Sequence, residues 1–119
     1  MIVLGSPVYF DTVSAQAKLM IDRCNCLMPY VGRSDGTFGF EGRIVRRKNG
    51  VFVAVAGTGQ ESDTIQATVS GFFAWANIKL IETILYAHDD DDEGGVETDD
   101  QQMSQALGIG VEIVQERAG

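Results

Sequence analysis

Three apolar runs, at residues 2–4, 51–56 and 78–86, set the organisation of this chain. The first two are continuously apolar, which is typical of strands that are buried on both faces of a parallel sheet. Each run is followed by a segment in which apolar residues recur at helical spacing. The predicted order is therefore β-α-β-α-β-α, which favours an α/β fold with a parallel sheet and right-handed crossovers.

The first helix is predicted over residues 14–26, with Ser14 as its N-cap and Pro29 beyond its end. Its expected inner face consists of Val13, Ala17, Met20, Cys24 and Leu27. The long segment 28–49 is expected to be a loop, with a short strand pair near residues 38–45, and its length is unusual for a connection.

The second helix is predicted over residues 64–76, because Asp63 and Gln66 have capping-box spacing and Asn77 is a plausible stop. Its apolar stripe is Ile65, Val69, Phe72, Phe73 and Ala76, and Trp75 is expected to pack against the sheet. The third helix is predicted over residues 99–115, with Thr98 as a cap and Met103, Leu107, Val111 and Val114 as its inner face.

Length and charge narrow the class of protein. The 119 residues suffice for a single domain, 1–119, and 17 acidic against 9 basic residues give a net charge of −8. A negative surface repels phosphate backbones, so we expect no nucleic-acid partner. No apolar stretch approaches the roughly 20 residues of a membrane span. The N-terminus lacks the features of a signal peptide, so we expect a cytoplasmic protein.

No metal site is predicted. Cys24 and Cys26 are poorly placed to bridge each other, and no second Cys or His pair completes a set of four ligands, so we expect two reduced thiols. The acidic run 89–93 lacks the ligand spacing of a calcium loop and is interpreted as a solvated loop. His88 has no recognisable motif around it and is interpreted as a surface residue.

Two loops are expected to meet at the carboxyl edge of the sheet, where open α/β sheets bind ligands. In the first loop, Ser6, Thr12 and Ser14 offer hydroxyls, and Tyr9 and Phe10 offer aromatic surface to a flat ring. The alternative is an ordinary turn with its aromatics in the core. The second loop is 57–61, a G-x-G motif that lacks a third glycine at position 62; its alternative is a plain tight turn.

The first segment resembles a known family. The residues that match its pattern in register are Ser6, Pro7, Val8, Tyr9, Ser14, Ala15, Gln16, Lys18, Ile21, Asp22 and Arg23. They are similar to the loop and helix after the third strand of the flavodoxin-like NADPH-dependent FMN reductases and iron–sulfur flavoproteins. Residues 51–61 resemble the fourth strand and its loop, and a weaker similarity continues through most of the chain.

The resemblance implies a strand order 2-1-3-4-5 with FMN at the switch point and NAD(P)H as the electron donor. It assigns no catalytic side chain. The FMN-binding residues that it implies are Ser6, Pro7, Val8, Tyr9, Phe10, Thr12, Ser14, Gly57, Thr58, Gly59 and Gln60.

The chain corresponds only to family strands 3, 4 and 5, so we expect a truncated flavodoxin-like three-layer α-β-α sandwich. The phosphate-binding loop lies in the part that has no counterpart, so FMN binding is expected to be weak or dependent on a partner. The strand at residues 2–4 becomes an exposed edge, which predicts a homodimer or higher oligomer. Two alternatives remain open: a non-catalytic module that assembles through this edge, or a chain that continues before residue 1.

Overall fold

The computed structural model describes residues 1–57, 62–88 and 95–118. The side chain of His88, the loop residues Thr58, Gly59 and Gln60, and the acidic run 89–93 lie outside the described part of the molecule, so the interpretations made for them stay predictions. The strands are β1 (Ile2–Tyr9), β2 (Thr12–Val13), β3 (Tyr30–Gly32), β4 (Phe38–Phe40), β5 (Lys48–Gly57) and β6 (Ile78–His88). The α-helices are α1 (Ala15–Arg23), α2 (Asp63–Trp75) and α3 (Asp100–Ala118), with short 3₁₀ helices at Cys24–Leu27 and Val96–Thr98.

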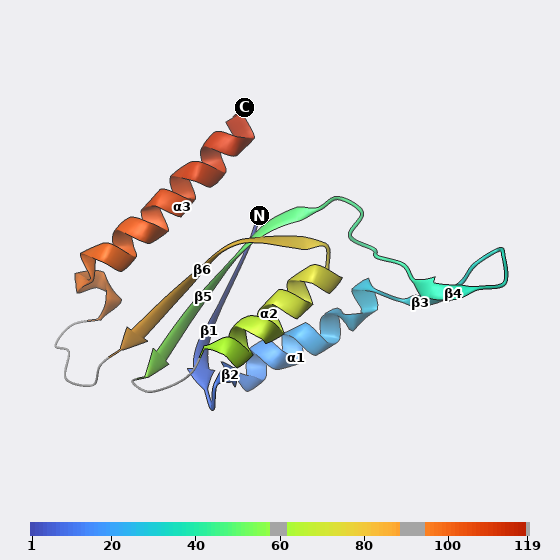
Figure 1. Cartoon of the computed structure of the whole chain (residues 1–119), viewed down its shortest axis with the longest axis horizontal. Helices are drawn as coiled ribbons and strands as arrows, with labels where there is room; N and C mark the ends of the chain where they lie inside the picture. The colour runs from blue at the N-terminus through green and yellow to red at the C-terminus, as the bar shows by residue number, and fades with distance from the viewer. Residues whose placement is uncertain (58–61, 89–94, 119) are drawn as a thin grey trace.

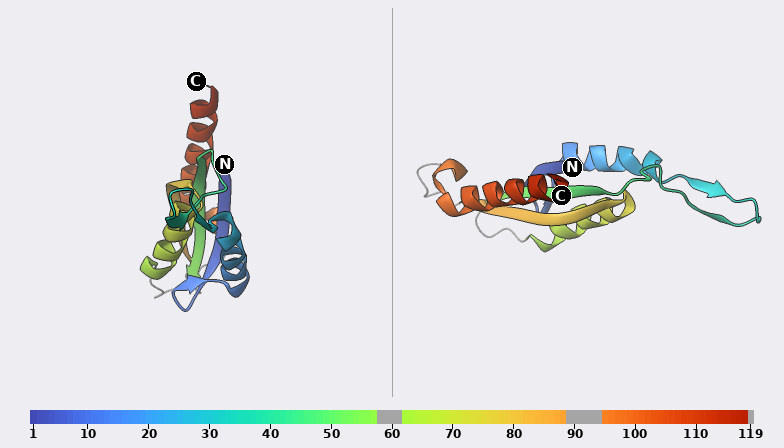
Figure 2. Two further views of the ribbon diagram at one scale, coloured as in Figure 1. Left: turned by 90° about the vertical axis from the view of Figure 1, so that its right-hand side faces the viewer. Right: turned by 90° about the horizontal axis from the view of Figure 1, so that it is seen from above.

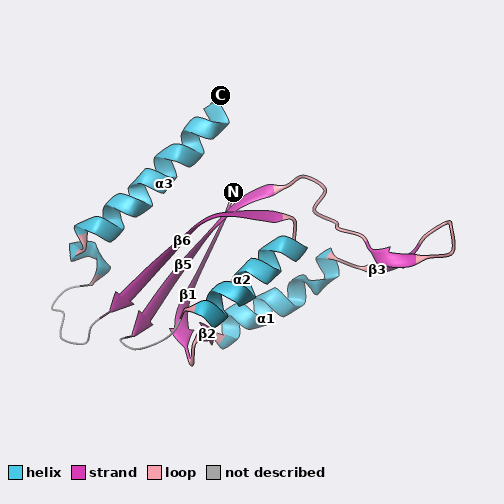
Figure 3. Ribbon diagram, viewed as in Figure 1, coloured by secondary structure: helices cyan, strands magenta, loops and turns pink. Residues whose placement is uncertain are grey.

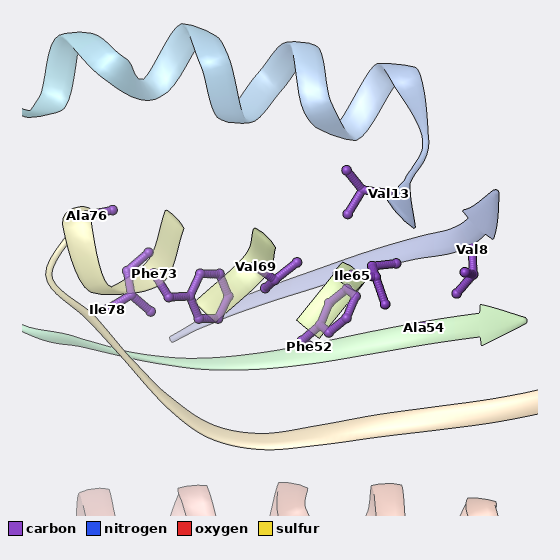
Figure 4. Packing of buried hydrophobic residues seen from close by; sticks show 9 residues of the cluster. All are labelled: Val8, Val13, Phe52, Ala54, Ile65, Val69, Phe73, Ala76 and Ile78. Carbon is purple, nitrogen blue, oxygen red and sulfur yellow. The ribbon is translucent and has the colours of Figure 1, made fainter. Parts of the chain in front are cut away.

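The main sheet has the order β2-β1-β5-β6, and its three long strands, β1, β5 and β6, run parallel (Figure 1). The short strand β2 folds back antiparallel on the end of β1. Helices α1 and α3 lie on opposite sides of the strands, and α2 packs on the side of α1 (Figure 4). The structure therefore confirms a mixed α/β fold in three layers, with three parallel strands (Figure 3).

The core lies between the sheet and helix α2 (Figure 4). Ile65, Val69 and Phe73 recur along one face of α2 and are each at most 1% exposed. They meet Phe52 and Ala54 of β5, and Val53 between these two residues is half-buried. Burial of large apolar side chains is the main driving force for this packing. The predicted stripe of the second helix is confirmed.

The expectation of burial on both faces is wrong for β1 and for the end of β5, whereas it holds at Val51 and Phe52 of β5, which are 4% and 0% exposed on opposite faces of the sheet. Along β1, exposed and covered residues alternate, and Val3 is 59% exposed. Val55 of β5 is 44% exposed, on the same side of the sheet. Helix α3 lies along β6 and does not reach over β1, so this side of β1 has no cover among the described residues (Figure 1).

Strand β1 is longer than the run 2–4 predicts, because it continues through residues 5–9, which were interpreted as a loop. Pro7 is tolerated there because β2 pairs only with Val8 and Tyr9, so one side of the backbone at Pro7 is open.

The first helix differs from its prediction in phase and in length. Ala17 and Ile21 pack against the core, whereas Met20 is 38% exposed. The α-helix ends at Arg23, and the 3₁₀ helix that follows changes the direction in which Cys24 and Leu27 point. Because α1 lies beside the end of the sheet, the rest of the molecule covers only a narrow strip of this helix (Figure 1).

The starts of the other two helices are shifted by one residue. Ser62 occupies the N-cap position of α2 in place of Asp63, and Gln66 donates from its side chain to the Ser62 hydroxyl at 3.1 Å. Asp99, and not Thr98, satisfies the first turn of α3, because its carboxylate accepts from the amides of Gln101 and Gln102 at 3.1 and 3.0 Å.

The predicted inner face of the third helix points to solvent. Met103, Leu107, Val111 and Val114 are 50%, 70%, 45% and 67% exposed, and Ile113 is the buried residue of α3 at 7%. Ile109 and Ile113 form a second stripe with helical spacing, and this one faces β6. The helix packs mainly on β6, at the edge of the sheet, and buries one of its two stripes there.

Residues 28–47 form an arm that projects from the body, with β3 and β4 as a separate two-stranded sheet (Figure 2). The strand pair that was expected near residues 38–45 lies instead at residues 30–40. Trp75, expected on the sheet, is 57% exposed and meets Phe40 of the arm edge-on at 5.1 Å between ring centroids.

The arm makes the molecule long. Its radius of gyration is 17.2 Å, whereas a compact chain of this length has a radius of about 13–14 Å. Within the described ranges, no helix combines the length and the apolar character that crossing a membrane requires.

Candidate functional site

A tight hairpin turn stands at the carboxyl end of β1. Strands β1 and β2 are joined by Phe10 and Asp11, which both have left-handed backbone conformations with φ of 48° and 62°. Two successive positive φ angles are typical of a type I′ turn, the turn that matches the twist of a hairpin. Phe10 is 98% exposed in a conformation that is costly for a large side chain. A fully exposed aromatic ring therefore stands at the edge of the sheet.

The hydroxyl of Ser6 holds this segment together. It donates to the carbonyl of Pro7 at 2.8 Å and accepts from the amide of Ser14 at 3.0 Å, and the residue is only 5% exposed. The Ser14 hydroxyl caps α1 by accepting from the amide of Ala17 at 3.2 Å, which confirms the predicted N-cap. Both hydroxyls are thus engaged within the chain and fix the path from β1 to α1.

An open pocket of about 540 Å³ lies where the parallel strands end. The residues that line it are Pro7, Val8, Tyr9, Val55, Ala56, Gly57, Tyr86, Gly95 and Val96. Its surface is mostly apolar, with Tyr9 and Tyr86 as aromatic components. Its size falls within the range of small-molecule sites, and its position is where open α/β sheets bind ligands.

Four of the predicted site residues line this pocket: Pro7, Val8, Tyr9 and Gly57. Thr12 lies in β2 and is half-buried, and Ser6 and Ser14 lie beneath the turn. Sequence reasoning missed Val55, Tyr86 and Val96. The site was predicted at the carboxyl ends of β1 and β5. The same rule applies to the carboxyl end of β6, because all three strands run parallel.

The pocket fits one half of FMN. An apolar hollow with aromatic side chains suits a flat isoalloxazine ring. A phosphate group needs positive charge or a cluster of backbone donors. Of the described residues that line the pocket, none carries a positive charge. The described lining thus suits the ring and offers no cation to the phosphate.

A larger hollow, of about 640 Å³, lies between α1 and α2 and reaches Phe40 and Trp75. It is remote from the carboxyl ends of the strands, so its size does not make it the candidate site. Cys24 lines it, with its thiol 3.8 Å from the sulfur of Met20. In the part of the chain that the structure describes, no three His, Cys, Asp or Glu residues gather as metal ligands.

A parallel α/β sandwich with a ring-sized apolar pocket at the carboxyl ends of its strands belongs to the flavodoxin-like class. The family model described as NADPH-dependent FMN reductase matches residues 1–92, and the chain belongs to this family. Neither the curated proteins nor the solved structures contain a significant match to the chain.

Proposed function

We propose that this protein is an FMN-dependent oxidoreductase that takes its electrons from NAD(P)H. The observation that carries the proposal is the apolar pocket at the carboxyl ends of β1, β5 and β6, in a chain of the FMN reductase family. Bound FMN would supply the redox chemistry by accepting a hydride from the nicotinamide ring. The protein's own part is to bind and orient the two rings and to exclude water from between them.

The residues of the first turn contact the isoalloxazine ring in this proposal. Pro7, Val8 and Tyr9 form one wall of the pocket, and Phe10 follows them in the turn. The bonds of Ser6 and Ser14 keep this wall in place, and Thr12 anchors the return strand β2. Gly57 lets the backbone of β5 approach the ring, and the loop residues Thr58, Gly59 and Gln60 belong to the same proposed set.

Affinity for FMN is expected to be weak unless a partner supplies donors for the phosphate, since the described lining of the pocket has no positive charge. Riboflavin lacks the phosphate but keeps the ring. If the ring supplies most of the binding energy, riboflavin and FMN should bind the isolated chain with dissociation constants within about threefold of each other, a difference of less than about 0.7 kcal/mol.

Titration with FMN, followed by quenching of flavin fluorescence, tests the proposal. Phe10→Asn keeps a residue that tolerates a positive φ and removes the ring, so it should weaken FMN binding by about tenfold, the equivalent of one aromatic contact of about 1.4 kcal/mol. Phe38→Asn is the matched control, because it removes another exposed phenyl ring, on the arm. Absence of quenching in the unaltered protein at high micromolar FMN would contradict the proposal.

We also propose that a second copy pairs with the open edge of β1, so that the protein works as a homodimer or higher oligomer in the cytoplasm. Along Ile2–Pro7 the described structure pairs β1 with β5 on one side, and β2 begins to pair only at Val8. An unpaired strand edge beside exposed apolar residues such as Val3 favours association.

A second candidate function is a non-catalytic module that assembles through the same edge. The lack of a cation in the described pocket lining and the open edge of β1 favour it. It predicts an associated protein that neither quenches flavin fluorescence nor oxidises NADPH when FMN is supplied. NADPH oxidation that depends on added FMN and on Phe10 would exclude it.

A further inference from the structure

The arm is a hairpin held by strand pairing and by hydrogen bonds in its turn and at its root. Its turn is closed by the bond from the amide of Arg33 to the carbonyl of Thr37 at 2.7 Å. Asp35 accepts from the amide and the hydroxyl of Thr37 at 2.9 and 2.6 Å, and these bonds hold the pKa of the Asp35 carboxyl below its usual value. At the root, the amide of Arg43 donates to the carbonyl of Leu27 at 2.8 Å. The arm therefore presents a defined surface.

Three aromatic rings of the arm and Trp75 of α2 form a row on that surface. Phe38, Tyr30, Phe40 and Trp75 follow one another with centroid distances of 5.8, 5.2 and 5.1 Å. Their exposed fractions are 65%, 63%, 50% and 57%. A row of contacting rings that remain half exposed is costly in water, and aromatic residues are enriched in protein interfaces.

The opposite side of the hairpin is polar. The guanidinium of Arg33 lies across Gly39, where a Cβ atom would come within 2.7 Å of its Nη2. Four of the nine Lys and Arg residues belong to the arm, residues 28–47, which holds only two of the seventeen acidic residues. The arm is thus both aromatic and basic, on a protein whose net charge is −8.

Helix α3 carries the complementary surface. Its outer stripe, Met103, Leu107, Val111 and Val114, is between 45% and 70% exposed. Residues 95–115 include four acidic residues and no Lys or Arg. Within one molecule the two surfaces cannot meet, because α3 and the arm lie at opposite ends of the long axis (Figures 1 and 2).

We propose that the arm of one copy docks on the outer stripe of α3 of a second copy of this chain. If each arm docks on the other molecule's α3, the contact is reciprocal and the pair closes as a dimer. The aromatic row and the stripe together expose on the order of 700 Å² per copy, taking roughly 200 Å² for an aromatic and roughly 100 Å² for an aliphatic side chain. This approaches the about 800 Å² per partner of a standard interface. Opposite charges around both surfaces set the orientation.

Two surface variants and their mixture test this contact. Phe38→Ser damages the arm and leaves α3 intact, whereas Leu107→Ser damages α3 and leaves the arm intact. Each variant alone should show a lower mass by sedimentation equilibrium than the unaltered chain at the same concentration. Mixed in equal amounts, they should regain mass, because one intact arm then meets one intact α3. Phe10→Asn, which removes an exposed phenyl ring elsewhere, should keep the mass of the unaltered chain.

Several outcomes would overturn the proposal. If Leu107→Ser keeps the full mass, the arm does not dock on α3. If the mixture shows no gain in mass over the separate variants, the arm and α3 do not bind each other. If the unaltered chain retains single-stranded nucleic acid, and Phe38→Ser loses it without a change in mass, the arm belongs to that partner. Circular dichroism of both variants should match the unaltered chain, and a variant that fails this check is replaced by Tyr30→Ser or Val111→Ser.

The FMN titration separates this proposal from the proposed function. Phe38→Ser should bind FMN as the unaltered chain does, because the arm is remote from the pocket. Phe10→Asn should lose FMN affinity and keep its mass. Pairing along β1 uses other residues, so the arm contact is tested in Val3→Lys, which damages that edge, and there its loss should halve the mass.

Discussion

Asn77 connects two parts of the molecule that are far apart in the sequence. Its backbone has a φ of 55°, which ends α2 and turns the chain into β6. Its side-chain amide donates to the carbonyl of Ile44 at 2.8 Å, where the arm returns to the sheet. One residue thus stops a helix and fixes the root of the arm.

Substitution of Asn77 should separate these two roles. Asn77→Gly keeps the positive φ but removes the hydrogen bond, so it should lower the free energy of unfolding by about 1 kcal/mol. Asn77→Ala keeps a Cβ in the left-handed region but loses the amide group that lets Asn tolerate this conformation, so it should cost about 1–2 kcal/mol more than Asn77→Gly. Urea unfolding of both variants measures the difference, and equal costs would contradict the role of the backbone conformation.

The fit between elements is tightest at Gly50, where β5, α2 and β6 meet. A Cβ there would lie 2.5 Å from the Phe73 ring and 2.6 Å from Ile78. Both side chains are nearly fully buried and cannot move aside. A glycine at this point lets α2 pack directly on the strand, next to the irregularity in pairing between Gly50 and Val51.

Gly50→Ala should therefore destabilise the fold by about 1–3 kcal/mol through overpacking. Gly5→Ala, in the neighbouring strand, is the control, because its Cβ would meet only the carbonyl of Val53 at 3.9 Å. Thermal unfolding should show a lower midpoint for Gly50→Ala alone. A similar shift in both variants would mean that glycine in a strand matters here for a reason other than space.

The sequence predicts best those helices whose apolar residues form a single stripe. Helix α2 has a single stripe, and its inner face is correct at Ile65, Val69 and Phe73. Helix α3 has two stripes, and nothing local to Leu107 or Ile113 shows which will meet β6. Other elements also decide how many faces of a strand are buried. Val3 and Val55, which the apolar pattern predicts to be buried, are therefore exposed.

The candidate site was predicted in part. Tyr9 and Gly57 were selected because they follow apolar runs, and both line the pocket. Tyr86 was missed because its run was interpreted as a strand with no loop motif after it. The extension of β1 to Tyr9 was not predicted because Gly5 and Pro7 are typical of loops, and pairing with β5 outweighs that preference.

On the scale of the whole molecule, the side of the sheet formed by β1 and β5 is open. Val3 and Val55 are exposed there, beside an edge with unpaired backbone groups. A second copy that continues the sheet would cover both the edge and these side chains.

Val3→Lys places a charge in the centre of this surface and should shift the association of the protein to at least tenfold higher concentration. Leu19→Lys is the control, because Leu19 is 57% exposed on α1, on the other side of the sheet. Sedimentation equilibrium over a range of concentrations measures both. Equal behaviour of the two variants would contradict pairing along β1.

The arm leaves the body at the end of α1 and returns at the start of β5, and the backbones of Leu27 and Arg43 are hydrogen-bonded at its root. The two ends of the arm are therefore adjacent. The length of the arm can change without moving the strands. The pocket lies at the other ends of those strands. The arm can therefore change in length or in sequence without altering the residues that line the pocket.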